Sequence, residues 1–193
     1  PVCPQLTPLY YGKVWLTETN SVCHQGIFNL TNAFANSLWL VDRFGLMAER
    51  GVPLMARQSL IGYNYSLLGD FPAEPITPSP DYFTTVLLRK LVGQRMLDTA
   101  PSFGLRQGSS SSRLRAFAYC SAARFTKGSV TISAVNLDES TEMILELDSA
   151  LCGSGSQQQY ERYMLEPAWP TTGPDASAPP RDKVTSRTML LNG

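Results

Sequence analysis

The sequence has no excess of charge of either sign. Its 193 residues include 16 Lys and Arg against 16 Asp and Glu, with a single His, so the formal net charge is zero. Proteins that bind nucleic acid usually carry a basic excess over the binding domain, because phosphates attract cations. The balance therefore argues against a nucleic-acid partner.

Long apolar runs are also missing. No run approaches the roughly 18 consecutive apolar residues of a membrane-spanning helix, and a composition of 43% hydrophobic and 17% charged residues is typical of a globular protein. We therefore expect a soluble chain without a membrane span. It begins at Pro1 without a Met or a signal-like segment and ends at Gly193 in an apparent strand, so we expect a fragment of a longer protein.

Closely spaced metal ligands are absent. The four cysteines form no C-x-x-C pair, and they stand at Cys3, Cys23, Cys120 and Cys152. Structural zinc sites are normally built from closely spaced Cys and His pairs, so we predict no metal site. Cys23 and Cys120 are instead typical of small buried hydrophobic residues on or beside strands. No cofactor is indicated, because Gly153-Ser154-Gly155 lacks the third glycine and the helix of a phosphate-binding loop.

Two N-x-S/T sequons stand at Asn29 and Asn64. Such sequons accept glycans in exported proteins. They favour a secreted protein, extracellular or lysosomal, in which disulfides form.

The first half of the sequence alternates strand and helix patterns. Apolar, β-favouring residues at 13–17 predict a buried strand, and the three-and-four spacing of apolar residues over about 31–50 predicts an amphipathic helix. A second buried strand is predicted over 52–61, and a second helix over 81–93, ended by Gly93. This order predicts parallel strands covered by helices.

After Gly93 the pattern changes to short strands separated by turn-rich stretches. The candidates are 94–100, 113–121, 129–136, 141–147, 158–165 and 184–191. Their spacing is typical of an antiparallel β-sandwich. Residues 94–133 also hold a local basic excess over Asp98, made of Arg95, Arg106, Arg113, Arg115, Arg124 and Lys127. These cations are either solvated strand faces or a contact for a sulfated sugar or a phosphate.

Glu18 is the strongest candidate for chemistry. It ends a predicted buried parallel strand, and barrel enzymes place their catalytic groups at the carboxyl ends of such strands. Arg57 and Gln58 come near the end of the next strand, so we expect them beside Glu18. An Arg close to a carboxylate keeps it ionised, which suits a nucleophile. The alternatives are that Glu18 caps the following turn and that Arg57 forms an ordinary structural ion pair.

Two weaker patterns accompany Glu18. His24 follows Ser21 by three residues, but there is no G-x-S-x-G elbow, and residues this close on one loop rarely act as nucleophile and base. Four aromatic residues crowd the region after the second strand, namely Tyr63, Tyr65, Phe71 and Tyr82. They indicate either a sugar-stacking platform or local packing.

Several short blocks, each weak alone, form a specific set. They are Lys13–Ser21, Phe34-Ala35, Trp39, Asp42–Leu46, Ala56–Gln58, Gly62, Asn64-Tyr65, Pro80–Phe83 and Leu88–Gly93. Together they resemble the heparanase and β-glucuronidase family of retaining glycoside hydrolases over about 11–100. Weaker matches follow at Tyr119-Cys120, Ala134–Leu137 and Leu190–Gly193.

The resemblance implies a (β/α)₈ TIM barrel followed by an antiparallel β-sandwich. Residues 1–93 would form the last two βα units, and residues 94–193 most of the sandwich, truncated at its end. The remaining barrel of the same protein would then be a partner of this segment. In animal members, a cysteine that matches Cys120 pairs with one near the end of the chain.

The resemblance also implies roles for individual residues. Glu18 matches the nucleophile that forms a covalent glycosyl-enzyme. Gln58 and Tyr65 match residues that contact the uronic acid, and the loop from Gly62 to Tyr65 is one residue shorter than in the animal enzyme. His24 and Gln25 stand where the animal enzyme has paired glycines, whose amides face the sugar carboxylate. A cationic or hydrogen-bonding His24 would take over that task.

The acid/base partner of the nucleophile lies on an earlier barrel strand in this family, about 5–5.5 Å from the nucleophile. It has no match here, so we expect the isolated chain to be inactive. The full-length protein would hydrolyse β-glucuronide linkages, endo or exo, in a glucuronic-acid-containing polysaccharide or glycoside. One alternative is a catalytically silent relative that binds acidic glycans through Arg113, Arg115 and Arg124, and another is a plain β-sandwich interaction module.

Overall fold

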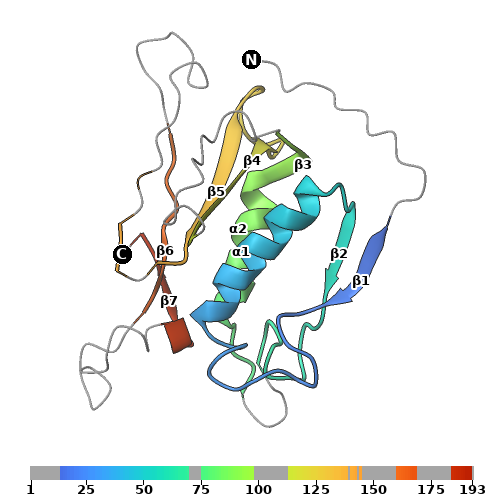
Figure 1. The fold of residues 1–193 in the computed structure, drawn as a ribbon, viewed down its shortest axis with the longest axis vertical. Coiled ribbons are helices and arrows are strands. Elements are labelled where there is room, and N and C mark those ends of the chain that lie inside the picture. The colour runs from blue at the N-terminus through green and yellow to red at the C-terminus, as the bar shows by residue number, and fades with distance from the viewer. Residues whose placement is uncertain are drawn as a thin grey trace.

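The structure, a computed structural model, describes residues 14–69, 75–97, 113–138, 140–142, 144, 160–168 and 184–192. Two helices and seven strands lie in this part of the chain (Figure 1). In order they are β1 (Trp15–Thr19), α1 (Phe34–Glu49), β2 (Leu54–Arg57), α2 (Pro80–Leu91), β3 (Val92–Met96), β4 (Leu114–Ser121), β5 (Val130–Asn136), β6 (Leu165–Pro167) and β7 (Met189–Leu191).

The first two strands are parallel, as predicted, with α1 between them. In the register, Trp15 pairs with Leu54 and Leu16 with Met55. The prediction that both strands are buried is wrong. The side chains of Val14 and Trp15 are 71% and 60% exposed, because no further described strand pairs with β1 or β2 and their sheet has two strands only.

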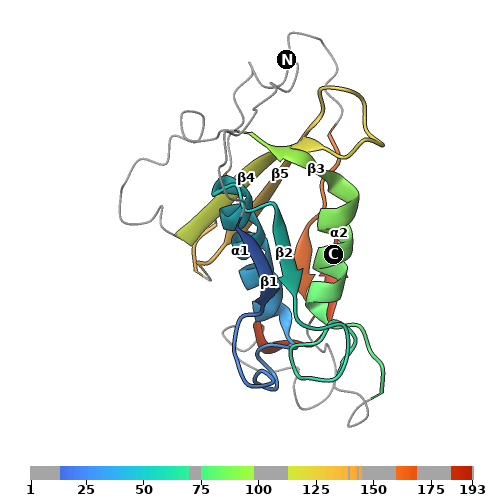
Figure 2. The same ribbon diagram turned by 90° about the vertical axis from the view of Figure 1, so that its right-hand side faces the viewer.

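Helix α1 packs against α2 and against the antiparallel strands β4 and β5 (Figure 2). Its contact with β4 is close at Gly45, where an added Cβ would come within 2.2 Å of the Phe117 ring. The Phe44 and Tyr119 rings lie nearby, with centroids 5.8 Å apart. The described core therefore joins the helices of the first half to the strands of the second.

Helix α2 has the expected start, with Pro80 and Asp81 in its first turn, and the basic pair Arg89 and Lys90 in its last turn. The prediction that Gly93 ends this helix is wrong. The helix ends at Leu91, and Gly93 already lies in β3. An added Cβ at Gly93 would come within 2.6 Å of two β4 carbonyl oxygens, so this glycine allows the close approach of two backbones.

The later strands are antiparallel. One sheet has the order β3-β4-β5, and β6 pairs with β7 in another. The candidates at 113–121 and 129–136 are confirmed, whereas the described strands near 94–100, 158–165 and 184–191 are shifted or shorter. Residues 141, 142 and 144 form no strand, and the rest of 141–147 lies outside the described residues. That the two sheets face each other as a sandwich stays a prediction.

The prediction that Cys23 and Cys120 are buried hydrophobic residues is wrong. Cys23 is a free thiol and is exposed, because it lies in the loop after β1 and not under a sheet. Cys120, on β4, is half-buried and disulfide-bonded. Cys3, Cys152, Phe71 and Arg106 lie outside the described residues.

Tyr119 contributes to the pH dependence of stability. Its side chain is 1% exposed, and its hydroxyl has no hydrogen-bond partner among the described residues. Burial, and to a smaller extent the charge of Glu49, raises the pKa of Tyr119 to about 12 from 10.0, against the opposing effect of the neighbouring Ser133 hydroxyl. The neutral phenol is therefore favoured in the folded state. The contribution of Tyr119 to stability is fully present below about pH 10 and falls as the pH rises toward 12.

Replacing Tyr119 by Phe is expected to remove this alkaline loss. At neutral pH the variant should be at least as stable as the parent, because a buried hydroxyl without a partner disappears. Between about pH 10 and 12 it should keep up to about 2–3 kcal/mol that the parent loses. Urea denaturation of both proteins across this pH range measures the difference, and parallel losses in both would contradict the prediction.

Candidate active site

The carboxyl ends of β1 and β2 lie at the same end of the molecule as the first turns of α1 and α2 (Figures 1 and 2). Residues 20–33 connect β1 with α1 there, and the described parts of the segment between β2 and α2 are 58–69 and 75–79. This arrangement follows from the parallel pairing, since each strand must be followed by a chain reversal into its helix. All six residues predicted for the site belong to β1 or to these loops.

Glu18 is an exposed residue of β1. Its carboxylate makes no hydrogen bond or ion pair with any residue that the structure describes, so it does not cap the following turn. It lies near Tyr65. Burial raises the pKa of the Tyr65 phenol, and the negative charges of Tyr63, Glu18 and Cys23 raise it further. The carboxylate is thus exposed and available to a ligand.

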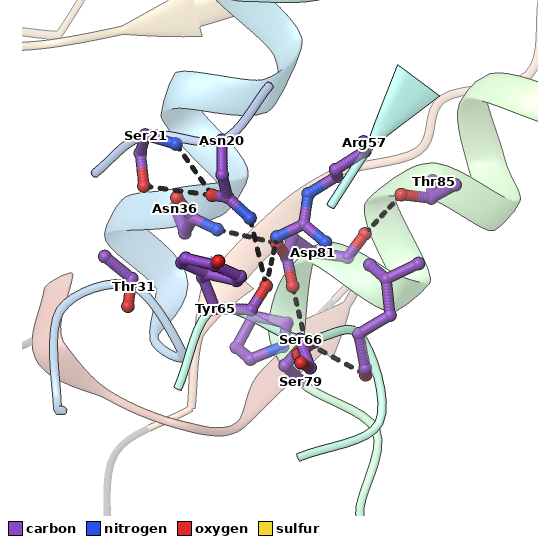
Figure 3. Close-up of polar contacts among 12 residues, drawn as sticks. Asn20, Ser21, Thr31, Asn36, Arg57, Tyr65, Ser66, Ser79, Asp81 and Thr85 are labelled. Atoms are coloured by element: carbon purple, nitrogen blue, oxygen red, sulfur yellow. Dashed lines mark hydrogen bonds and ion pairs between the residues drawn. The ribbon is translucent and has the colours of Figure 1, made fainter. Parts of the chain in front are cut away.

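Arg57 does not pair with Glu18, which corrects the prediction from sequence. Its Nη2 donates to the Asp81 carboxylate and, at 2.8 Å, to the Tyr65 carbonyl oxygen (Figure 3). The Arg57 and Asp81 side chains are only 8% and 1% exposed. Arg57 therefore forms a buried structural ion pair, but with Asp81 and not with Glu18, and it is directed toward α2 because a buried carboxylate lies there.

Asp81 is a residue that the sequence analysis used only as a helix start. Its carboxylate also accepts hydrogen bonds from Asn36 Nδ2 at 2.7 Å and from Ser79 Oγ at 2.5 Å. Burial raises the pKa of Asp81, against the opposing effects of the Arg57 charge and of these two hydrogen bonds. Burial likewise lowers the pKa of Arg57, against the effect of Asp81. Nothing in the sequence pattern marks Asp81, and not Glu18, as the partner of Arg57.

Asn20 joins the ends of the two strands. Its Nδ2 donates to the carbonyl oxygen of Gln58 and, at 3.2 Å, to that of Tyr65. The Gln58 amide donates in turn to the Thr19 carbonyl at 3.0 Å. The Ser21 hydroxyl donates to Asn20 Oδ1 at 3.3 Å, which agrees with the rejection of a Ser21–His24 pair. The backbone of Gln58 is thereby fixed against the end of β1.

Tyr65 packs against the loop that follows β1. Its ring centroid lies 5.6 Å from that of Tyr63. An added Cβ at Gly26 would come within 2.9 Å of the Tyr65 ring. Gly62 has φ +112°, a conformation that other residues rarely adopt, and its amide donates to the Gly69 carbonyl at 3.3 Å. Glycines thus let the two loops approach each other and turn.

His24 and Gln25 both have left-handed backbone conformations, with φ of 56° and 69°. This region favours glycine, because a Cβ crowds the backbone there. Both residues are exposed, and neither side chain bonds to a described residue. The backbone therefore has the conformation that paired glycines would adopt, although the residues are not glycines.

Replacing Gln25 by Gly is expected to raise the free energy of unfolding by up to about 1 kcal/mol. The gain comes from relieved backbone strain and is reduced by the greater freedom of glycine in the unfolded chain. A matched control is Gln94→Gly, at an exposed position of β3, where the same change should lower stability by about 0.5–1 kcal/mol. Thermal or urea unfolding measures both, and losses of equal size would contradict the prediction.

No model of a known protein family matches the chain. It is 32% identical to heparanase of Bos taurus over 186 residues, which cover 94% of this chain and 29% of the relative. It is 31% identical to heparanase of Mus musculus over 196 residues, covering 100% of this chain and 32% of the relative. The chain resembles the heparanases.

The similarity extends to other heparanase-like proteins. The identity is 31% to heparanase-like protein 3 of Arabidopsis thaliana, over 69% of this chain, and 26% to a Mus musculus protein named inactive heparanase-2, over 80% of it. The chain spans less than a third of the length of the bovine and mouse heparanases. The similarity to this chain therefore concerns only part of the bovine and of the mouse heparanase.

The structure brings some of the predicted site residues together. Asn20 joins the backbones of Gln58 and Tyr65, and the charge of Glu18 contributes to the raised pKa of the Tyr65 phenol. His24 and Gln25 lie on the exposed part of the loop after β1. The described residues hold no cluster of three His, Cys, Asp or Glu side chains that could bind a metal ion. No described helix is long and apolar enough to cross a membrane.

Proposed function

We propose that the full-length protein is a retaining glycoside hydrolase that cleaves β-glucuronide linkages with Glu18 as its nucleophile. The observation that carries the proposal is the position of Glu18: it stands near the carboxyl end of β1, exposed and without an ion pair among the described residues. The similarity to heparanases supports this reading. An unpaired carboxylate at this place is suited to attack a bound sugar.

The proposed architecture is a (β/α)₈ barrel with an appended β-sandwich. The parallel pair β1–β2, with α1 between the strands, supports the barrel, and the antiparallel pairing of the later strands supports the sandwich. The remaining barrel of the same protein would cover the exposed apolar residues of β1. It would also supply the acid/base carboxyl group, so the isolated chain should be inactive.

In the proposed reaction, Glu18 attacks the anomeric carbon while the acid/base residue protonates the departing oxygen. Water, activated by the same residue, then releases the sugar from the covalent glycosyl-enzyme. Gln58 and Tyr65 would contact the uronic acid, in the loop that Gly62 turns, and the His24-Gln25 segment would lie near the sugar carboxylate. No metal or cofactor is required for these steps.

The proposed substrate is a glucuronic-acid-containing polysaccharide or glycoside, cleaved in endo or exo fashion by a secreted or lysosomal protein. The alternative of a silent glycan binder has less support. Arg113 pairs with Asp138 at 3.1 Å and Arg115 with Asp42 at 2.9 Å. Arg124 Nε donates to a helix carbonyl at 3.0 Å. These cations are therefore partly engaged within the chain.

Covalent labelling tests the proposal. An activated 2-deoxy-2-fluoro-β-glucuronide, incubated with the full-length protein, should add one sugar per molecule, and peptide mass mapping should find it on Glu18. Glu142, an exposed glutamate elsewhere, serves as an internal control and should stay unlabelled. A label on another carboxylate, or turnover of the reagent without any label, would overturn the assignment. Hydrolysis of an aryl β-glucuronide by the isolated chain would contradict the need for the remaining barrel.

A further inference from the structure

The backbone of Tyr65 is held by side chains from two strand ends. Its carbonyl oxygen accepts a hydrogen bond from Arg57 Nη2 at 2.8 Å, at the end of β2, and one from Asn20 Nδ2 at 3.2 Å, just after β1 (Figure 3). Two donors from different strands restrict a carbonyl much more than one does. The place of Tyr65 therefore depends on how those two donors are oriented.

The orientation of Arg57 depends in turn on Asp81. Arg57 Nε and Nη1 are buried and have no hydrogen-bond partner among the described residues, so Nη2 makes the contacts that orient the guanidinium. Asp81 is itself fully buried and is fixed by Asn36, from the first turn of α1, and by Ser79, just before α2. One carboxylate thus connects β2 with the starts of both helices.

The ring of Tyr65 extends from this anchored backbone toward the loop after β1. It lies so close to Gly26 that no side chain would fit there, and Thr31, which is buried, lies at the same point. The ring also lies near enough to Glu18 for the two groups to interact electrostatically. A shift of the Tyr65 backbone would move the ring relative to Glu18, because Gly26 blocks compensation on one side.

We propose that Asp81 and Arg57 are positioning residues, which set the place of Tyr65 beside Glu18 without touching the substrate. The inference has two consequences. The structural one, the place of Tyr65, rests on the contacts alone, and the kinetic one, an effect on KM, also rests on the proposed function. Both side chains are buried away from solvent, so their effect passes through the Tyr65 carbonyl. The two consequences are measured separately.

The structural consequence is tested without turnover. In the full-length protein, 3-fluorotyrosine replaces Tyr65, and ¹⁹F NMR follows the titration of its phenol. Glu18→Gln should lower the pKa of this phenol in the parent, because a nearby negative charge is removed. In the Asp81→Asn background, the same change should have less than half that effect, since the ring has moved. Asp42→Asn, at the separate pair with Arg115, should leave the effect unchanged.

The kinetic consequence is tested with an aryl β-glucuronide. Asp81→Asn should raise KM by about tenfold with a smaller change in kcat, which is the pattern of lost ground-state binding. The double variant Arg57→Met with Asp81→Leu removes the Arg57 donor to Tyr65 without leaving an unpaired buried charge, and it serves if Asp81→Asn does not fold. It should reduce the coupling between Glu18 and residue 65 as well.

An unchanged coupling in Asp81→Asn, or in the double variant if only that one folds, would overturn the proposal. If the parent hydrolyses no glucuronide, the proposed function fails, but the ¹⁹F titration still decides whether Asp81 positions Tyr65. If turnover is normal in Asp81→Asn while the coupling is lost, Tyr65 is positioned but has no part in substrate binding, and the kinetic half of the proposal is wrong.

Discussion

Replacing Glu18 by Gln in the full-length protein is expected to lower kcat for an aryl β-glucuronide by at least about 10⁴-fold, a loss typical of removing a nucleophile. Glutamine has nearly the same shape, but its amide cannot form the glycosyl-enzyme. The side chain makes no hydrogen bond or ion pair with the described residues, so the substitution should leave the fold intact. The loss should therefore be in chemistry and not in stability.

Steady-state kinetics with circular dichroism or thermal unfolding of the same samples measures both properties. Glu142→Gln, at an exposed site, is the matched control and should retain full activity. In Glu18→Ala, added azide should restore part of the activity and give a glucuronyl azide of inverted configuration, because azide occupies the space of the carboxylate and attacks in its place. A Glu18→Gln variant with near-normal kcat would contradict the assignment of Glu18 as the nucleophile.

Replacing Asp81 by Ala is expected to lower the free energy of unfolding by about 3–5 kcal/mol. The change leaves the Arg57 guanidinium buried without its counter-charge, and it also removes the acceptor of the Asn36 and Ser79 hydrogen bonds. Because most domains are stable by only about 5–15 kcal/mol, this is a large fraction of the total. Urea or thermal denaturation measures the loss.

A matched control is the half-exposed pair of Asp42 with Arg115, whose side chains are 27% and 40% exposed. Asp42→Ala should cost no more than about 1 kcal/mol, since solvent screens the charges and hydrates the arginine that remains. The double variant Arg57→Met with Asp81→Leu should regain much of the stability lost in Asp81→Ala, because no buried charge is left unpaired. Equal losses in Asp81→Ala and Asp42→Ala would contradict this account.

The sequence predicted the local elements of the first half well. The spacing of apolar residues located α1 within a few residues of its observed bounds, and Pro80 and Asp81 marked the start of α2. These features depend on neighbours along the chain, such as periodic burial and the first-turn preferences of a helix. The end of α2 was misplaced, because Gly93 serves a close contact with β4, some 27 residues further along.

The contacts of the site were less predictable. Adjacent carboxyl ends of parallel strands suggested that Arg57 and Gln58 lie near Glu18, and the register pairs Arg57 with Thr19, but nothing in the sequence indicated which carboxylate Arg57 would bind. Arg57 binds Asp81, which lies 24 residues further along the chain in the first turn of α2. The reason is desolvation: a buried guanidinium requires a buried counter-charge, and Glu18 is exposed.

The sequence by itself determined the two helices, the parallel order of the first two strands and the place of Glu18 near a strand end, since each depends on short-range pattern and chain order. Only the tertiary structure decided that Asp81 binds Arg57, that Asn20 and Arg57 share the Tyr65 carbonyl, and that Cys23 is an exposed thiol. Burial decides each of these outcomes, and the burial of a side chain depends on segments distant in the sequence.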